Sequence, residues 1–175
     1  MSVTTDNLSK AVGREANAEL AAALLKIKHC TDQLSDNQLW WRPSETMNSI
    51  ANLLLHLVGN VRQWIVSGVG GVADTRERQQ EFDERSQIPK IEVVQRLEDV
   101  VAESKTVLSA VTADELLRVR RIQGFDVTGI QAILESVAHF RGHAQEIVHM
   151  TRCQLGDSYE FDFIPGTAEQ GASAE

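Results

Sequence analysis

Apolar residues recur at intervals of three and four positions along four long stretches of the chain, which is the periodicity of amphipathic helices. The four stretches run from about Leu8 to Leu34, from about Asn48 to Ser67, from Pro89 to Val111 and from Thr128 to about Leu155. No alternating pattern typical of strands competes with them over these lengths. Four long helices joined by loops of moderate length predict an all-α protein with the architecture of a four-helix bundle.

Capping signals place the starts of the helices and of the shorter turns between them. Three pairs have the spacing of a capping box: Ser35 with Gln38, Thr112 with Glu115, and Thr128 with Gln131. Pro43 ends the first short turn, and the glycines within residues 67–71 break the second long helix. Residues 74–85 are highly charged, which is consistent with a short solvated helix. Residues 118–127 read as a loop, with a local extended pair as the alternative.

Length and composition set the domain organisation and exclude several classes of function. The 175 residues predict a single domain over residues 1–165, and the small, polar composition after it predicts a disordered tail over residues 166–175. A net charge of −8 argues against a phosphate-binding surface, so we expect no nucleic-acid partner. No apolar run approaches the roughly 20 residues of a membrane span. Two cysteines without CxxC spacing, and no signal-peptide pattern, make a cytoplasmic location the expectation.

The fourth helical stretch carries the clearest candidate for chemistry. His139 and His143 are four positions apart, so a helix places them on one face with Cβ atoms roughly 5–6 Å apart, close enough to share one divalent cation. Imidazole suits Zn, Ni, Fe or Cu better than Mg or Ca. Glu146 shares this face as a ligand, as a hydrogen-bond acceptor behind a ligand, or as a general base. The spacing alone is weak evidence, because two ligands do not close a site.

A third ligand has to come from another part of the chain. His56 lies in the middle of the second helix, on the flank of its apolar stripe, where a histidine is more often a boundary residue than a ligand. His29 is less constrained still, and His149 is rotated by about 80° from His139 around the helix. The sequence alone therefore leaves the third ligand open.

The fourth helix also carries an apolar face nearly opposite the histidines. That face comprises Ile130, Ile133, Leu134, Val137, Ala144 and Val148. A helix with two such sides is deeply buried or packs against two partners. We expect the histidine side to line a cleft within the bundle and the apolar side to meet a second subunit, which predicts a homodimer.

Three other groups have weaker signals. Cys30 and Cys153 have no evident activating base, so burial is the expected role. The basic cluster from Arg118 to Arg121 fits a solvated loop or an anion contact at the mouth of the bundle. Trp40 and Trp41 are expected in the core or at a helix cap, with the lining of a pocket mouth as the alternative.

Two segments carry a resemblance to a known family. One is Trp40–Pro43 followed by Asn48–Leu57, and the other is His139–Ile147. They resemble the DinB-like superfamily of bacterial helical-bundle proteins, also called DinB/YfiT-like. The first is similar to its tryptophan–proline loop and histidine-bearing second helix, and the second to the HxxxH of its last bundle helix. The resemblance covers the chain from about Leu8 to Leu155.

The resemblance implies a specific metal site. In this superfamily a divalent metal ion, often zinc or nickel, is bound by one histidine of the second helix and two of the HxxxH. Carried over, the ligands are His56, His139 and His143, which leaves open positions for water or substrate. The family often has glutamine three residues after the last histidine, where this chain has Glu146. A carboxylate there could strengthen cation binding or act as a catalytic base. Members are commonly dimers.

The resemblance also implies a class of reaction. Its members include thiol S-transferases that use bacillithiol or mycothiol, and a maleylpyruvate isomerase. We therefore expect a metal-dependent enzyme acting on a small molecule, with a low-molecular-weight thiol as cosubstrate. A hydrolase that uses a metal-activated water is the sister version. The Arg118 to Arg121 cluster is then the candidate contact for an anionic cosubstrate. The alternatives are a non-catalytic metal- or ligand-binding dimer of a stress response, and a plain helical scaffold with incidental histidines.

Overall fold

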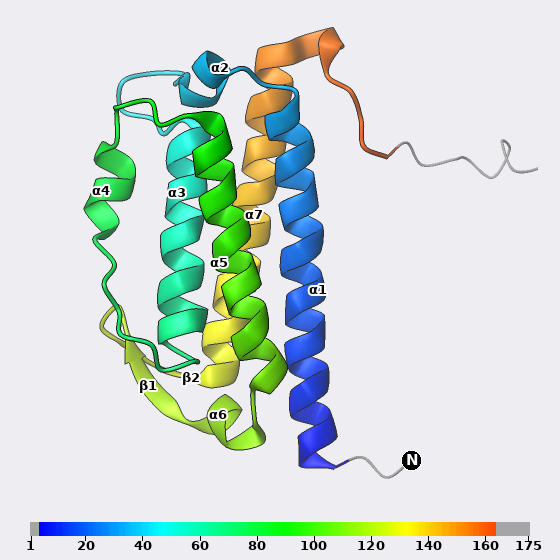
Figure 1. The fold of residues 1–175 in the computed structure, drawn as a ribbon, viewed down its shortest axis with the longest axis vertical. Helices are drawn as coiled ribbons and strands as arrows, with labels where there is room; N and C mark the ends of the chain where they lie inside the picture. The colour runs from blue at the N-terminus through cyan, green and yellow to red at the C-terminus, as the bar shows by residue number, and fades with distance from the viewer. Residues whose placement is uncertain (1–3, 164–175) are drawn as a thin grey trace, which may run out of the picture.

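Four long helices build a bundle in the computed structural model, which describes residues 4–163. They are α1 (Thr5–Asp32), α3 (Ile50–Val61), α5 (Lys90–Ala110) and α7 (Gly129–Leu155). Each of α1 and α3 packs between α5 and α7, so α1 and α3 face each other across a diagonal (Figure 1). The predicted all-α bundle is confirmed. The predicted disordered tail lies outside the described residues.

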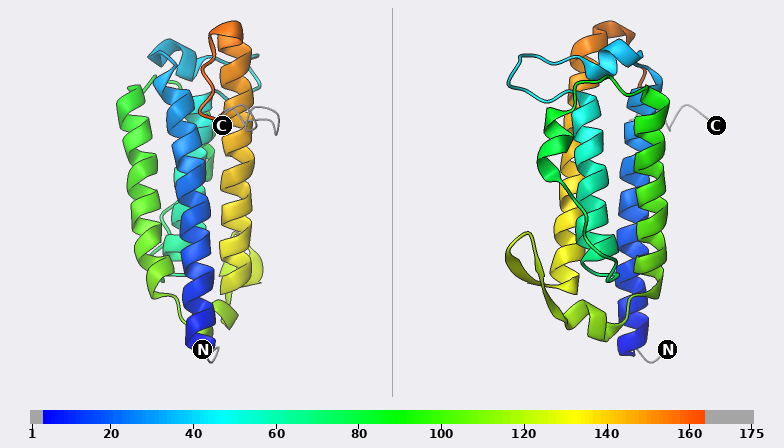
Figure 2. Two further views of the ribbon diagram at one scale, coloured as in Figure 1. Left: turned by 90° about the vertical axis from the view of Figure 1, so that its right-hand side faces the viewer. Right: turned by 60° about the vertical axis from the view of Figure 1, so that its left-hand side comes forward.

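The direction of the helices requires one long connection. In Figure 1, α1 and α7 run upward while α3 and α5 both run downward. Because α3 and α5 are parallel, the chain must return along the whole bundle between them. Residues 72–89, which we call the strap, make this return on the outside of α3 and contain the short helix α4 (Arg78–Asp83) (Figures 1 and 2).

The short elements follow the capping signals of the sequence. Helix α2 (Asp36–Trp40) begins with a complete capping box between Ser35 and Gln38. Helix α6 (Ala113–Leu117) is capped by the Thr112 hydroxyl, which accepts a hydrogen bond from a backbone N–H one turn later. The Thr128 side chain caps α7 in the same way. A polar side chain at each start therefore satisfies a backbone donor that has no partner within its helix.

The expected loop after α6 is a two-stranded hairpin. Strands β1 (Val119–Ile122) and β2 (Phe125–Thr128) pair antiparallel, and the pair supports the extended alternative. The turn residues Gln123 and Gly124 both have positive φ, 51° and 85°. This is the conformation of a type I′ turn, whose twist matches that of the strands it joins.

The sequence predicted one continuous helix to Ser67, but the second long helix is not α-helical throughout. Beyond α3 the chain widens into a π-helical turn over Arg62–Ser67, where the Gly68 N–H donates to the Gln63 carbonyl five residues earlier at 2.9 Å. Such wide turns are frequent at functional sites. Trp64 lies within this turn, two helical turns after His56.

The interior explains several of the expected burials and corrects others. Cys30 is fully buried, whereas Cys153 is exposed, so burial is wrong for the second cysteine. Trp40 is buried and donates through Nε1 to the Ile88 carbonyl at 2.9 Å, while Trp41, 46% exposed, is the C-cap residue of α2, as the cap alternative predicted. Within residues 4–163, none of the helices has both the length and the apolar character needed to cross a bilayer.

The apolar face expected on α7 is divided between the interior and the surface. Ile133 and Ala144 are buried inside this chain's own bundle, and Leu134 is exposed. The buried side of α7 is centred on Phe140 and Ile147, so the interior lies between the apolar face and the histidines. The homodimer through this helix stays a prediction.

Candidate metal centre

Three histidines from two helices meet on one side of the bundle. His56 comes from α3, and His139 and His143 come from α7. One ring nitrogen of each lies within 4.8 Å of the other two, and the His56 and His139 Nε2 atoms are 2.8 Å apart. The ring planes are nearly perpendicular, with interplanar angles of 79° to 89°. Residues 83 positions apart in the sequence therefore point their imidazoles at one small volume.

A buried carboxylate holds the back of the His56 ring. Glu81 Oε2 lies 2.9 Å from His56 Nδ1, and a carboxylate only accepts hydrogen bonds, so Nδ1 carries the proton and donates. In the neutral ring Nε2 then carries the lone pair, and this atom faces His139. Arg76 grips the same carboxylate with both arms of its guanidinium, at 2.7 and 2.8 Å. The exposed fractions of the Arg76, Glu81 and His56 side chains are only 3%, 11% and 7%.

The strap is held to α3 and α2 so that this carboxylate reaches the histidine. Asn52 of α3 donates to the Glu81 backbone carbonyl at 2.9 Å, and Trp40 of α2 donates to the Ile88 carbonyl. Gly59 allows the close approach, because a Cβ there would lie 1.9 Å from Glu81 Oε1. The sequence suggested a short solvated helix here. The short helix is present and none of its residues is fully buried, but Glu81 turns inward and contacts His56, which the sequence did not predict.

A second carboxylate stands behind His143 on the same helix. Glu146 Oε2 lies 2.7 Å from His143 Nδ1, which leaves His143 Nε2 for the cluster. This pair is more exposed than the first, at 22% for His143 and 48% for Glu146. Of the three roles the sequence left open for Glu146, this geometry corresponds to the hydrogen-bond acceptor behind a ligand. Carboxylates in this position orient a ligating imidazole and raise its basicity.

The surroundings keep His139 in the protonation state that a metal ligand needs. Burial, then the neighbouring His143 and His56, then the charges of Arg76 and Arg78, lower the pKa of His139 from 6.5 to about 4. His139 is therefore neutral at physiological pH, with a lone pair available. Burial alone would raise the pKa of Glu81, but hydrogen bonds from Arg76 and His56 and the charge of Arg76 outweigh it and lower that pKa. Glu81 is ionised.

The donor set fits a divalent transition-metal ion. Tetrahedral zinc with Zn–N bonds near 2.1 Å separates its nitrogen ligands by roughly 3.4 Å. This separation lies between the 2.8 Å from His56 Nε2 to His139 Nε2 and the 4.8 Å within which all three nitrogens lie. Across the described part of the chain this is the one group of three such side chains. His29 instead contacts the Glu160 carbonyl, and His149 lies on the surface beside Cys153. Neither joins the cluster.

A small cavity opens beside two of the three histidines. Its volume is about 190 Å³, and its lining comprises His56, Asn60, Trp64, Arg76, Arg78, Gln123, Glu135 and His139. The residues that sequence reasoning missed are mostly here or in the strap: Trp64, Arg76, Arg78 and Glu81. Arg76 and Glu81 stand five positions apart in a charged segment with no apolar periodicity, so nothing local marked them as inward-facing.

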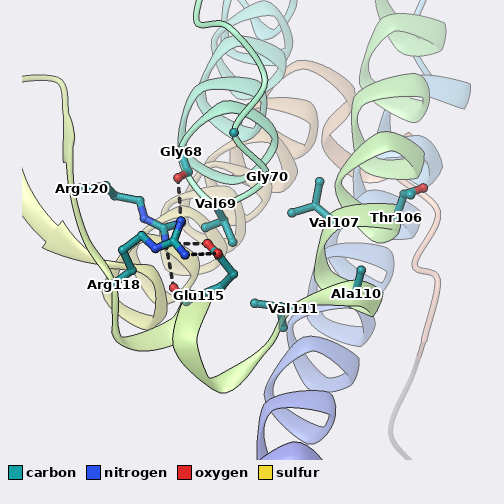
Figure 3. Close-up of a pocket in the computed structure, with 11 residues that line it drawn as sticks. Gly68, Val69, Gly70, Thr106, Val107, Ala110, Val111, Glu115, Arg118 and Arg120 are labelled. Carbon is teal, nitrogen blue, oxygen red and sulfur yellow. Dashed lines mark hydrogen bonds and ion pairs between the residues drawn. The ribbon is translucent and has the colours of Figure 1, made fainter.

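The predicted basic cluster lies at a different cavity, at the end of the bundle where α5 meets α6. This cavity has a volume of about 530 Å³ and shares no lining residue with the smaller one (Figure 3). Arg120 is committed to structure there, because its guanidinium donates to the carbonyls of Gly68 and Glu115, each at 2.7 Å (Figure 3). Arg118 and Arg121 pair with Glu115 and Asp126. None of the three arginines reaches the histidines.

Comparison with known families decides the family of this chain. A family described as proteins of unknown function, DUF1572, matches residues 7–167, which is nearly the whole sequence. The chain belongs to the DUF1572 family. The match covers both elements of the histidine cluster and the strap between them, so all the features described above are parts of one DUF1572 unit.

A solved structure shares the fold of this DUF1572 protein. It is the crystal structure of a DinB-like protein, YjoA, from Bacillus subtilis, with a TM-score of 0.63 and 15% sequence identity over 84% of this chain and 96% of that one. At this identity the likeness shows the fold alone, and it confirms the DinB-like resemblance at that level. No curated protein matches the sequence.

Proposed function

We propose that His56, His139 and His143 bind a divalent metal ion, zinc or nickel, and that the protein is a metal-dependent enzyme, a thiol S-transferase or a hydrolase. The observation that carries this proposal is the convergence of the three rings, with one nitrogen of each within 4.8 Å of the others. Two of the three rings also have a carboxylate at the opposite nitrogen. A hydrogen bond from the second ring nitrogen to a carboxylate is typical of metal-ligating histidines.

The chain's own residues have separate tasks in this site. A bound divalent ion would lower the pKa of a thiol or a water molecule at its open positions. Glu81 and Arg76 fix the His56 ring so that its Nε2 faces the other two histidines. Glu146 holds His143 in the matching orientation, and a role as general base would require it to leave this hydrogen bond. The cavity beside His139 is the place for the substrate.

Metal analysis of protein purified without a histidine tag tests the site. We expect close to one zinc or nickel ion per chain after incubation with the metal, and an increase in melting temperature on binding, because binding to the folded state stabilises it. The double variant His139→Ala, His143→Ala should lose both. His149→Ala is the matched control, since His149 is an exposed histidine on the same helix outside the cluster. Sub-stoichiometric metal that is equal in all three proteins would overturn the proposal.

Activity assays then address the reaction. The metal-loaded protein is incubated with a low-molecular-weight thiol and a chromogenic electrophile, and separately with a chromogenic ester. Conjugation that requires both thiol and metal supports an S-transferase, and metal-dependent ester cleavage supports a hydrolase. A protein that binds metal stoichiometrically and does neither supports the non-catalytic alternative. Light scattering at micromolar concentration tests the predicted homodimer, and a strictly monomeric protein would exclude it.

A further inference from the structure

The cavity beside His56 and His139 contains hydrogen-bond donors that have no partner within the described residues. The indole Nε1 of Trp64 is buried and unpaired. Asn60 is 8% exposed and accepts from the Ser136 hydroxyl through Oδ1 at 2.9 Å, so its Nδ2 donors are left for the cavity. Buried donors are nearly always satisfied in folded proteins, by protein, water or ligand. These two line the same small space.

A positive charge completes this donor set. Arg78 is an exposed residue of the lining, forms no ion pair among the described residues, and lies over the Phe82 ring with its guanidinium carbon 4.8 Å from the ring centroid. Arg76, also in the lining, is neutralised by Glu81. Glu135 is the one carboxylate of the lining, and like Arg78 it is exposed. The lining thus offers N–H donors and one cation without an ion-pair partner in the part of the chain that the structure describes, together with one carboxylate.

We propose that this cavity binds the carboxylate group of a small organic acid next to the metal site, through Trp64 Nε1, Asn60 Nδ2 and the Arg78 guanidinium. Carboxylates accept several hydrogen bonds at once, and charge-assisted bonds to arginine are the strongest of these. The volume of about 190 Å³ corresponds to roughly six water molecules, below the 300 Å³ where cavities for drug-sized ligands begin. The ligand, or the end of it that enters, is small.

This inference deepens the proposed function and rests on it for the identity of the neighbouring reaction site. It adds the substrate class, a small carboxylate, and three residues that select it. The π-helical turn contributes to this cavity, because it contains Trp64. Gln123 of the β1–β2 hairpin lines the same cavity.

Nuclear magnetic resonance of the indole N–H groups tests the proposal directly. The chain has three tryptophans, so the spectrum has three indole signals, and Trp64→Phe identifies the one of Trp64. Acetate is titrated into the zinc-loaded protein, with acetamide as the uncharged probe of similar shape. We expect the Trp64 signal to shift saturably with acetate and not with acetamide, while the signals of Trp40 and Trp41 stay in place.

Two charge variants of the lining should move the acetate affinity in opposite directions. Arg78→Gln is expected to weaken binding about fivefold to tenfold, and Glu135→Gln to strengthen it about twofold, because the two residues carry opposite charges beside the same ligand. Trp41→Phe is the matched control for Trp64→Phe, and only the latter should weaken binding. Equal behaviour of the two charge variants would count against electrostatic recognition in this cavity.

The outcomes separate this inference from the proposed function. If zinc binds stoichiometrically and the Trp64 signal does not shift with acetate, the cavity holds water only. The carboxylate proposal is then wrong, while the metal site remains supported. If zinc does not bind, the proposed function fails. The same titration of the metal-free protein then decides the cavity: an Arg78-dependent Trp64 shift supports the carboxylate site, and no shift overturns it.

Discussion

Two carboxylate–histidine pairs support the cluster, and they differ in almost everything except their hydrogen bond. Glu81 contacts His56 at 2.9 Å and Glu146 contacts His143 at 2.7 Å. Glu81 comes from the strap and its side chain is only 11% exposed, and Arg76 clamps it while lying 3.1 Å from the same His56 nitrogen, Nδ1. Glu146 lies one turn from its histidine on the same helix and is half exposed. One pair thus depends on the tertiary fold, and the other needs only a helix.

The difference shows where the site is vulnerable. Removing one partner of a buried ion pair strongly destabilises the fold, because the remaining charge stays unpaired in a medium of low dielectric constant. An exposed pair is screened by water and salt and contributes little. The geometry of the metal site should therefore depend strongly on the strap and weakly on Glu146. Four predictions test this contrast, in order of expected effect.

The largest effect is expected from Glu81→Ala. The variant leaves Arg76 buried at 3% exposure without a partner and frees the His56 ring. We expect a loss of about 3 kcal/mol in the free energy of unfolding, and metal affinity lower by roughly tenfold to a hundredfold. Urea unfolding and zinc titration measure the two effects. Glu77→Ala, an exposed residue of the strap, is the control and should change neither. Equal behaviour of the two variants would contradict the buried clamp.

The same contrast explains what could be read from the sequence. The four helices, their caps and the His139–His143 pair follow from local spacing, because each signal is carried by residues only a few positions apart. The same holds for the pair of His143 and Glu146. His56 could be assigned only through the family resemblance.

The strap was misread because its inward side has no periodicity. Its Arg76 and Glu81 meet a helix about 20 residues earlier through a contact that only the fold creates. Charge-rich segments are usually solvated, and this one is solvated except where two charges neutralise each other. The π-helical turn and its Trp64 gave no local signal either. Contacts that depend on tertiary packing are thus the part that the sequence alone leaves out.

A second prediction acts on the strap without touching a charge. In Gly59→Ala the new Cβ would lie 1.9 Å from Glu81 Oε1 and 2.7 Å from Arg76 Nε, so the paired side chains of the strap must shift away from α3. We expect a loss of about 2 kcal/mol in the free energy of unfolding and weaker metal binding. Gly142→Ala is the matched control, because its Cβ would meet nothing within 4 Å. That helical position should gain about 0.5–1 kcal/mol. A stable Gly59→Ala protein with unchanged metal affinity would show that metal binding does not require the close approach of the Glu81 side chain to α3.

A third prediction uses pH to distinguish the contributions of His139 and Glu81 in the metal-free protein. The pKa of His139 falls from 6.5 unfolded to about 4 folded, so the unfolded state binds the proton more tightly, and stability drops as pH falls from about 6.5 to 4. The full shift corresponds to about 3 kcal/mol, which partial exposure reduces to about 1–2. The lowered pKa of Glu81 adds a further loss below about pH 4.5. In urea unfolding at a series of pH values, His139→Gln should remove the first loss and keep the second. An unchanged pH profile would contradict this assignment.

The smallest effect is expected from Glu146→Gln, which removes the charge behind His143 but keeps a hydrogen-bond acceptor. Because Glu146 is 48% exposed, we expect stability within about 0.5 kcal/mol of the parent protein and metal affinity only a few-fold weaker. Zinc titrations at low and at high salt sharpen the comparison with Glu81→Gln. Salt screens exposed charges far more than buried ones, so high salt should erase the Glu146→Gln difference and leave that of Glu81→Gln. Equal losses at both salt concentrations would mean that the two carboxylates support the site to the same degree, and that burial does not separate them.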